Sequence, residues 1–444
     1  MTRARRLTAL PALLIVALSL AALLFGAGVT AQDKALGASR VQLPNGLTVL
    51  VRENPTAPVV AFSLMTRMGT RSENAANAGI SNFLQLMLVR GTTSKNGIEI
   101  IEAAERMGGS LDAYAEVDHA EIAATALSRH WSDMLALVAD VVLNPTIPEA
   151  TAGAVKDFLL KQIRNRGDKP YDAGVDFIGH RLYGSHPYGW NPLGRRESVD
   201  KVDRNALVAH YRRFYVPASM VLAVSGRVKT DEVLAQVRAR FGNMPEGYGP
   251  APALPSPPPL EDSRDVIEVP GAQAQILMGG FAPTLTEPDH AAVKVLASVL
   301  GGGMAGRFFS ELRDKQGLAY TTAMLYPSRL ERGFIQAQIG TAPENVERAE
   351  AALLKELDRI QREPVGNEEL GVAKAYLLGN LAMDRRTNAR QAWYLAAYEL
   401  AGVGHEYLEG HVARVRAVTA ADVQRVARRY LATLRTVIVR PPAR

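Results

Sequence analysis

The chain has 444 residues, 47% of them hydrophobic and 22% charged, so it is long enough to build more than one hydrophobic core. It contains no cysteine, which excludes disulfides, cysteine zinc sites and thiol catalysis. The net charge is +6, and +3 remains without the three arginines near the N-terminus. This balance, together with the lack of a basic run with interleaved aromatic residues, argues against a nucleic-acid-binding protein.

The N-terminus has the composition of an export signal. Three arginines among the first six residues precede an almost purely apolar run from Leu7 to Gly28, and Val29-Thr30-Ala31 resembles a cleavage site. We therefore predict that residues 1–31 are a signal peptide. The apolar run is also long enough for an uncleaved membrane anchor, which is the alternative. Export without any cysteine fits the bacterial periplasm.

The first half of the remaining chain, residues 40–243, has alternating strand and helix patterns. Val41–Arg52 is predicted to form two strands joined at Asn45-Gly46, a strong hairpin signal. Apolar spacing predicts the further strands Val59–Met65, a pair within Leu111–Thr125, and Ser219–Val224. The same criterion predicts the helices Ile80–Val89, Ile98–Met107, several within His130–Tyr183, Asp203–Tyr215 and Thr230–Phe241.

A proline-rich linker, residues 244–263, separates this half from a second half, residues 264–441. Pro245–Pro259 contains seven prolines, which disfavour both helix and sheet. The pattern then restarts, with pairs of strands predicted in Asp265–Phe281 and Ala319–Ile339 and a last strand at Thr436–Val439. The predicted helices are Ala291–Leu300, Arg307–Arg313, Pro343–Arg362, Asn367–Leu381, Gln391–Ala401 and Ala420–Tyr430.

The two halves share the order of their elements and weak sequence echoes. Tyr211–Tyr215 and Arg428–Tyr430 both lead into a strand, and Pro145–Gln162 resembles Pro364–Asn380. The period is about 200 residues, which indicates duplication of a whole α+β domain and not a solenoid.

The segment from Ala78 to Thr92 carries a family resemblance. It resembles the metal helix of the insulinase, pitrilysin and mitochondrial-processing-peptidase family, the inverzincins, whose core is His-x-x-Glu-His. One helical turn there places two imidazoles on a zinc ion and a carboxylate on the attacking water. The corresponding positions in this sequence are Asn82, Gln85 and Leu86, while the flanking residues retain the family pattern.

These replacements remove the family's zinc chemistry. Carboxamides are poor zinc ligands, Gln85 cannot accept a proton, and Leu86 has no donor atom. The family's third ligand is a glutamate in a later helix, and Phe158–Arg164 matches that context with Gln162 at the ligand position. We therefore expect no metal, no cofactor and no catalytic residue in this chain alone, and no metallopeptidase activity without a partner.

Two loops extend the resemblance over nearly the whole mature chain. His186–Gly189, followed by Pro192-Leu193-Gly194, resembles one family loop, and Phe214–Ala218 resembles another. In relatives, each of two homologous domains has an antiparallel-rich mixed sheet with helices packed on one face. The resemblance implies this α+β fold here.

The second half retains a pair that contacts the substrate in relatives. Arg313 and Tyr320 stand seven residues apart, as in the family segment that reaches across to a zinc site in the other half or subunit. A guanidinium can donate to a peptide carbonyl, and a tyrosine hydroxyl can donate to a developing oxyanion. The alternative is structural: Arg313 ends a helix and Tyr320 fills a strand face.

A glycine run precedes this pair, at Gly301, Gly302, Gly303 and Gly306. It is interpreted as a lid or peptide-contacting loop, which the family has in its non-catalytic subunits, or as a turn that ends a helix. Leu111–Glu116 resembles the strand on which relatives add an extended peptide.

Other polar groups do not form metal sites by their spacing. His405 and His411 are six residues apart, as are His180 and His186, and this spacing places each pair on different helix faces. Near a predicted strand turn, His119 and Glu121 share a face, but two groups make no site.

The sequence therefore predicts a non-catalytic, substrate-binding subunit of a heterodimeric zinc endopeptidase. The partner would be a homologous subunit that carries the zinc and an intact His-x-x-Glu-His, and the two would enclose an extended peptide. The alternative is a peptide-binding or assembly protein with no proteolytic role. Nothing in the sequence supports a third possibility, a peptidase that uses another site.

Overall fold

A computed structural model describes residues 37–247, 249 and 254–442. The predicted signal peptide lies outside the described residues. None of the described helices has the length and apolarity needed to cross a bilayer. From Ser39 onward the described residues form one compact unit, and they include two β-sheets.

The first sheet has six strands in the order β1-β2-β6-β3-β5-β4. Strand β2 runs parallel to β6, while β3 is antiparallel to both β6 and β5, and β4 is antiparallel to β5. The predicted hairpin is confirmed, because the N–H of Leu43 donates to the carbonyl of Leu47 at 2.8 Å across its turn. The strands are β1 (Ala38–Gln42), β2 (Thr48–Glu53), β3 (Val59–Thr66), β4 (Ser110–Ala115), β5 (Ala120–Leu127) and β6 (Met220–Gly226).

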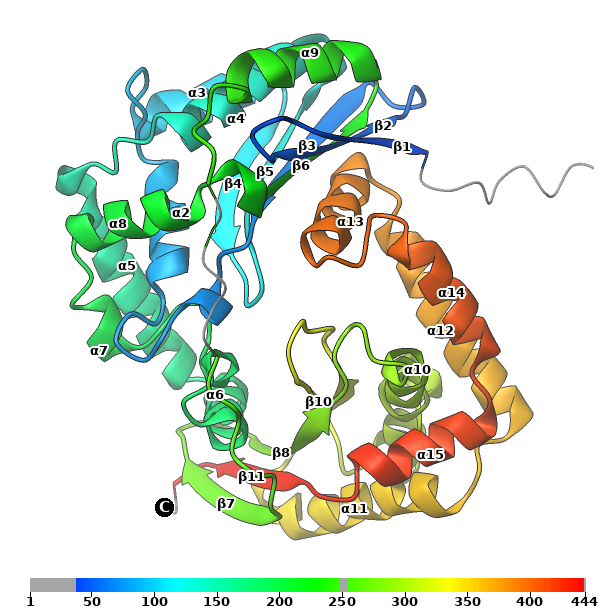
Figure 1. Cartoon of the computed structure of the whole chain (residues 1–444). Coiled ribbons are helices and arrows are strands. Elements are labelled where there is room, and N and C mark those ends of the chain that lie inside the picture. Colours follow the sequence, from blue (N-terminus) through cyan, green and yellow to red (C-terminus); the bar gives the residue numbers. More distant parts are fainter. Residues whose placement is uncertain (1–36, 248, 250–253, 443–444) are drawn as a thin grey trace, which may run out of the picture. The chain divides into compact units, whose positions relative to one another are not determined.

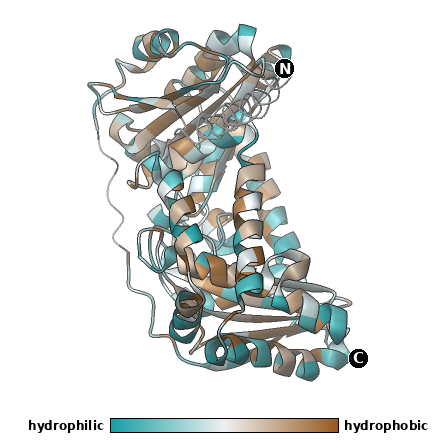
Figure 2. Cartoon of the chain, turned by 90° about the vertical axis from the view of Figure 1, so that its right-hand side faces the viewer, coloured by the Kyte–Doolittle hydropathy of each residue, from teal (hydrophilic) through white to brown (hydrophobic). Residues whose placement is uncertain are grey.

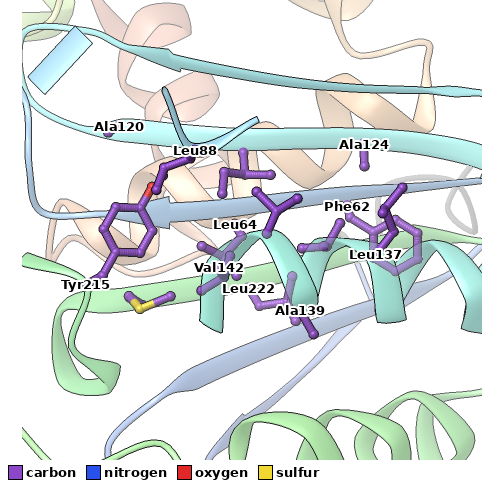
Figure 3. Close-up of a cluster of buried hydrophobic side chains, with 14 of the residues drawn as sticks. Phe62, Leu64, Leu88, Ala120, Ala124, Leu137, Ala139, Val142, Tyr215 and Leu222 are labelled. Atoms are coloured by element: carbon purple, nitrogen blue, oxygen red, sulfur yellow. The ribbon is translucent and has the colours of Figure 1, made fainter. Parts of the chain in front are cut away.

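Helices cover one face of this sheet and enclose a core. Figure 3 shows part of that core, in which the Tyr215 ring lies among aliphatic side chains from strands and helices. Burial of such side chains is the main stabilising term for the layer. The helices of this half are α2 (Ile80–Leu88), α3 (Gly97–Arg106), α4 (Trp131–Leu143), α5 (Glu149–Gly167), α6 (Pro170–Tyr183), α7 (Arg196–Val199), α8 (Arg204–Phe214) and α9 (Thr230–Phe241).

The second sheet repeats the first without its outermost strand. Its order is β7-β11-β8-β10-β9, with β7 parallel to β11 and all other pairs antiparallel. This matches β2-β6-β3-β5-β4 in order and direction, so the predicted duplication is reproduced in three dimensions. The strands are β7 (Ser263–Glu268), β8 (Ala274–Ala282), β9 (Thr321–Leu325), β10 (Gly333–Thr341) and β11 (Arg435–Arg440).

The helices of the second half include two that the sequence did not predict as such. Helix α14 was missed, and the helix predicted at Arg307–Arg313 is a π-helix, Phe308–Lys315. The α-helices are α10 (His290–Gly301), α11 (Val346–Arg362), α12 (Asn367–Asp384), α13 (Asn388–Leu400), α14 (Tyr407–Ala417) and α15 (Ala420–Tyr430). The predicted α+β class, with two mixed sheets and helices, is confirmed.

Each half also places one helix on the other half's sheet. Helix α13 packs on β3 and β6, on the side of the first sheet away from α9 and α4 (Figure 1), and α6 packs on β8 and β11 of the second sheet. In α6, Gly174 lies so close to the second sheet that an added Cβ would be 2.6 Å from Leu277 Cδ1. The outer faces of the helices carry hydrophilic residues, while the strands are mostly hydrophobic (Figure 2).

Candidate functional site

A buried carboxylate fixes the start of α2, the helix that resembles the family's metal helix. The oxygens of Glu73 accept hydrogen bonds from the backbone N–H groups of Gly79 at 2.8 Å and Ser81 at 2.9 Å. The indole of Trp190 donates to the same carboxylate at 3.3 Å. Burial raises the pKa of Glu73 to about 7, while these hydrogen bonds act in the opposite direction.

A neighbouring loop packs directly on the same helix end. Gly79 has a φ of 93°, and an added Cβ there would lie 2.6 Å from the carbonyl oxygen of Leu193. An added Cβ on Gly194 would lie 2.2 Å from the carbonyl oxygen of Ala78, to which the Ser198 hydroxyl donates at 2.7 Å. The two segments that carried the family resemblance are therefore in contact.

The four altered positions of the family's metal site lie on α2 and α5, which pack against each other. Gln85 is fully buried, and its Oε1 accepts a hydrogen bond from the Tyr215 hydroxyl at 3.1 Å. Its Nε2 has no hydrogen-bond partner among the described residues. Leu86 is partly buried and packs on the core, and Asn82 and Gln162 are half-buried.

These side chains do not fit a zinc ion. A tetrahedral zinc site needs imidazole, thiolate or carboxylate donors. These four positions instead offer three carboxamides and one isobutyl group. The carboxamides belong to Asn82 and Gln85 on α2 and to Gln162 on α5, and the isobutyl group belongs to Leu86. Over the described part of the chain, no three His, Asp or Glu side chains are grouped so that they could hold a metal. The zinc chemistry of the family therefore has no donor set at this place.

The glycine run of the second half is tightly packed. It begins at Gly301, the last residue of α10, and continues into a short 3₁₀ turn from Gly303 to Ala305. An added Cβ would lie 2.3 Å from Met324 N at Gly301 and 2.2 Å from Ser298 O at Gly302. Close approach of backbone segments thus requires glycine here, whichever functional interpretation holds. Similar close contacts exist at Gly303 and Gly306.

The π-helix that follows presents Arg313 to solvent. Single π-helical turns are rare and are often found at functional sites. The guanidinium of Arg313 lies 5.0 Å from the ring centroid of Phe309 and forms no ion pair with a described residue. Nearby, Arg307 is buried and holds Glu369 with two hydrogen bonds of 2.6 and 3.0 Å, which anchors the segment.

Tyr320 is also exposed. The residue is 55% exposed, and its backbone N–H donates to the carbonyl of Gly340 at 2.8 Å, just before β9 begins. Its hydroxyl has no hydrogen-bond partner in the described part of the chain. The ring of Tyr320 is therefore not packed into the core, and its hydroxyl is available to a molecule outside this chain.

The strand compared with the family's peptide-binding strand is an edge strand. Among the described strands, β4 pairs only with β5 and ends the order of the first sheet, as β9 does in the second. An edge strand offers backbone N–H and C=O groups to an added strand.

Sequence reasoning missed a cluster of polar groups beyond the β4–β5 turn. His119 and Glu121 were set aside because two groups make no site, but His119 lies beside Asp118 and further groups from the second half: His290, Lys294, Arg329 and His411. Glu121, in contrast, bonds to Ser63 at 2.5 Å and to Tyr114. Sequence spacing could not reveal this cluster because its members are up to 293 residues apart.

Comparison with known families agrees with this geometry. The sequence model described as Insulinase (Peptidase family M16) matches residues 48–189, and the one described as Peptidase M16 inactive domain matches residues 201–377. The chain belongs to the insulinase family of M16 peptidases. The second of these two matches is to a domain that the family description calls inactive.

Several curated relatives of this insulinase-family chain are named as uncharacterized zinc proteases. One from Mycobacterium tuberculosis is 29% identical over 406 residues, which cover 89% of this chain and 91% of the relative. One from Bacillus subtilis is 26% identical over a match that covers 88% of this chain and 94% of the relative. The chain is therefore similar to these proteins over nearly its whole length.

Solved structures share the fold. A structure described as a peptidase M16 inactive domain from Pseudomonas fluorescens has a TM-score of 0.85 at 23% identity and covers 92% of this chain and 99% of its own. The structure of a protease from Helicobacter pylori has a TM-score of 0.86 at 20% identity, and the match covers 91% of this chain and 99% of the other. At these identities the likeness establishes the fold alone.

Proposed function

We propose that this chain is the non-catalytic, substrate-binding subunit of a zinc endopeptidase whose other subunit carries the metal. One combination of features carries the proposal: the altered metal site is built into the core, while Arg313 and Tyr320 stay exposed without ion pair or side-chain hydrogen bond among the described residues. Both side chains are therefore available to a partner subunit or a bound peptide.

In this proposal the exposed pair completes the partner's site. The hydroxyl of Tyr320 donates to the oxyanion that develops on the scissile carbonyl, and the Arg313 guanidinium donates to a neighbouring peptide carbonyl. A zinc ion held by the partner would supply the activated water. This chain adds binding and transition-state contacts, with β4 or β9 as the edge to which an extended peptide adds.

The proposal also includes export to the periplasm after cleavage of residues 1–31. The test of the assembly is native purification of the tagged chain from its own compartment, with zinc quantified in the product. A stoichiometric homologous chain and about one zinc per pair are expected. A metal-free protein without that chain would favour a peptide-binding or assembly role.

The test of the exposed pair uses the reconstituted assembly. We expect Tyr320→Phe to lower kcat at least tenfold, as loss of one oxyanion donor does, with little change in KM. Arg313→Ala should lower kcat/KM. Arg106→Ala, which removes a 68% exposed arginine side chain on α3, is the matched control and should have no effect. Unchanged turnover with Tyr320→Phe would disprove the catalytic contact.

A further inference from the structure

A cavity of about 600 Å³ lies on the opposite side of the first sheet from α2. Leu111, Ala113 and Ala115 of β4 belong to the core on the α2 side. Since successive side chains of a strand alternate, Tyr114 and Glu116 point to the other side, and both line the cavity. The sheet therefore separates this cavity from the altered metal site. Its volume suits a small organic ligand.

One wall of the cavity holds a basic cluster, Lys294 and His290 of α10 with His411 of α14. Lys294 Nζ donates to the carbonyl of Tyr326 at 2.8 Å and has no carboxylate within 4.0 Å among the described residues. The imidazoles of His290 and His411 lie 5.2 Å apart between centroids. Burial lowers the pKa of Lys294 to about 8, so its ammonium remains largely charged at neutral pH.

His411 supplies an unpartnered ring nitrogen, which can donate a hydrogen bond in the tautomer that carries the proton on Nδ1. Its side chain belongs to a residue only 7% exposed, and its Nδ1 is buried without a hydrogen-bond partner in the described part of the chain. Unpaired polar atoms in an interior are costly and often indicate a missing ligand or water. The Nε2 of His290, in contrast, is engaged with the Ser328 hydroxyl at 2.9 Å.

A second wall is aromatic and aliphatic. Helix α13 contributes a row of three aromatic rings to the cavity, those of Trp393, Tyr394 and Tyr398. The ring centroid of Tyr394 lies 5.1 Å from that of Trp393 and 5.8 Å from that of Tyr398. Leucines of α12 complete this apolar surface: Leu377, Leu378 and Leu381. Such a surface favours an apolar or aromatic group on the ligand.

Acidic groups also line the cavity, but they belong to the β4–β5 turn. Asp118 accepts a hydrogen bond from the Tyr188 hydroxyl and lies in the field of Arg329. Glu116 also lies in the field of Arg329, and burial raises the pKa of its carboxyl group. Arg390 is held by Asp384 outside the lining residues. The basic cluster of α10 and α14 thus remains without an anionic partner in the described part of the chain.

We infer that this cavity is a ligand site for a small carboxylate with an apolar or aromatic body, bound through Lys294 Nζ and His411 Nδ1. The C-terminal residue of a peptide and a free arylalkyl carboxylic acid share this chemistry. The inference does not depend on a zinc-bearing partner, because every group that it uses belongs to this chain.

The test is calorimetric titration of the mature chain with three probes: N-acetylphenylalanine, its C-terminal amide and 3-phenylpropionate. The first is expected to bind at one site per chain, and the amide at least about tenfold more weakly, because it lacks the charge. Tighter binding of N-acetylphenylalanine than of 3-phenylpropionate would indicate a peptide end as the ligand, and the reverse would indicate a free acid.

Substitutions locate the site. Lys294→Met keeps the apolar stem and should weaken N-acetylphenylalanine about tenfold or more, as should His411→Phe, whereas Lys355→Met on the exposed face of α11 should not. Binding should also change tryptophan fluorescence in the wild type but not in Trp393→Phe. No binding of either carboxylate at millimolar concentration, or equal binding of acid and amide, would overturn the inference even if a variant failed to fold.

Discussion

The hydroxyl of Tyr215 donates a hydrogen bond to Oε1 of Gln85 at 3.1 Å, in the fully buried layer between α2 and the end of α8. Gln85 stands where the insulinase family has its general base. Burial raises the pKa of Tyr215 above its usual range, so this hydroxyl stays protonated and remains a donor. The pair thus acts as a neutral structural contact in the core.

A double-substitution cycle tests this contact. Tyr215→Phe leaves the Gln85 carboxamide buried without a donor, and Gln85→Leu leaves the tyrosine hydroxyl unpaired, so each should cost about 1–2 kcal/mol of unfolding free energy. The combined variant should be close to the wild type, because no unpaired polar group remains. Urea denaturation at pH 7 gives all four values. Additive losses would show that the hydrogen bond is not what couples the two residues.

The backbone of the altered metal site can be tested by restoring the family's side chains. We expect the variant Asn82→His, Gln85→Glu, Leu86→His and Gln162→Glu to retain about one zinc per chain. Positions 82 and 86 lie on one face of α2, and α5, which carries position 162, packs against α2. Elemental analysis after dialysis measures this. The matched control omits Gln162→Glu and should hold zinc more weakly. A folded four-fold variant without zinc would show that α2 and α5 no longer hold the ligand geometry.

Two glycines of α6 should respond in opposite directions to alanine. Gly174→Ala places a Cβ 2.6 Å from Leu277 Cδ1 and 2.8 Å from Val439 Cγ2, both on fully buried residues, so a loss of about 1–3 kcal/mol is expected. Gly179→Ala meets nothing nearer than 3.9 Å and should gain about 0.5–1 kcal/mol from lower backbone entropy in the unfolded chain. Thermal denaturation of both variants gives the comparison. Equal effects would argue against close packing of α6 on the second sheet.

His210 should make the fold sensitive to acid. Burial, and to a smaller extent Arg213, lowers the pKa of His210 from 6.5 to about 4. Between these two pH values the unfolded chain binds a proton on this histidine that the folded chain does not bind. The contribution of neutral His210 to the unfolding free energy is therefore complete above pH 6.5 and is lost as the pH falls toward 4. On going from pH 8 to pH 5, the wild type should lose about 2 kcal/mol relative to His210→Gln.

Urea unfolding at the two pH values measures this difference. The glutamine amide can still reach the Ser81 hydroxyl, which lies 3.1 Å from Nε2 of His210, so the variant should fold. The raised pKa of Glu73 has the opposite effect on stability, because it favours the folded chain as the pH falls. This effect is the same in the wild type and in the variant, so it cancels when the two are compared. The same stability difference at pH 8 and pH 5 would contradict the buried, neutral state of His210.

Most elements could be predicted from periodicity and turn residues. Helix α9, Thr230–Phe241, and helix α15, Ala420–Tyr430, have the predicted bounds, and the hairpin at Asn45-Gly46 forms as expected. Helix α14 was missed because its sequence, from Tyr407 to Ala417, has charged residues and a glycine with only a weak apolar stripe. The π-helical form of Phe308–Lys315 has no local sequence signal.

For the candidate site, the sequence identified the replaced metal ligands, because the loss of a donor atom at Leu86 is a matter of chemistry and not of conformation. The exposure of Arg313 and Tyr320 was not predictable, since each also had a structural role in a helix or strand as its alternative. The three-dimensional arrangement shows that both side chains are exposed and that Arg313 lies in the last turn of its helix.

The sequence by itself determined the family, the α+β class, the duplication and the absence of zinc donors on α2. These properties depend on local spacing and on the identity of single side chains. The tertiary structure alone decided that α13 and α6 each pack on the other half's sheet, and that Lys294 and His411 meet Trp393 around one cavity. Contacts between residues so far apart in the chain depend on packing of complete layers, which no local pattern encodes.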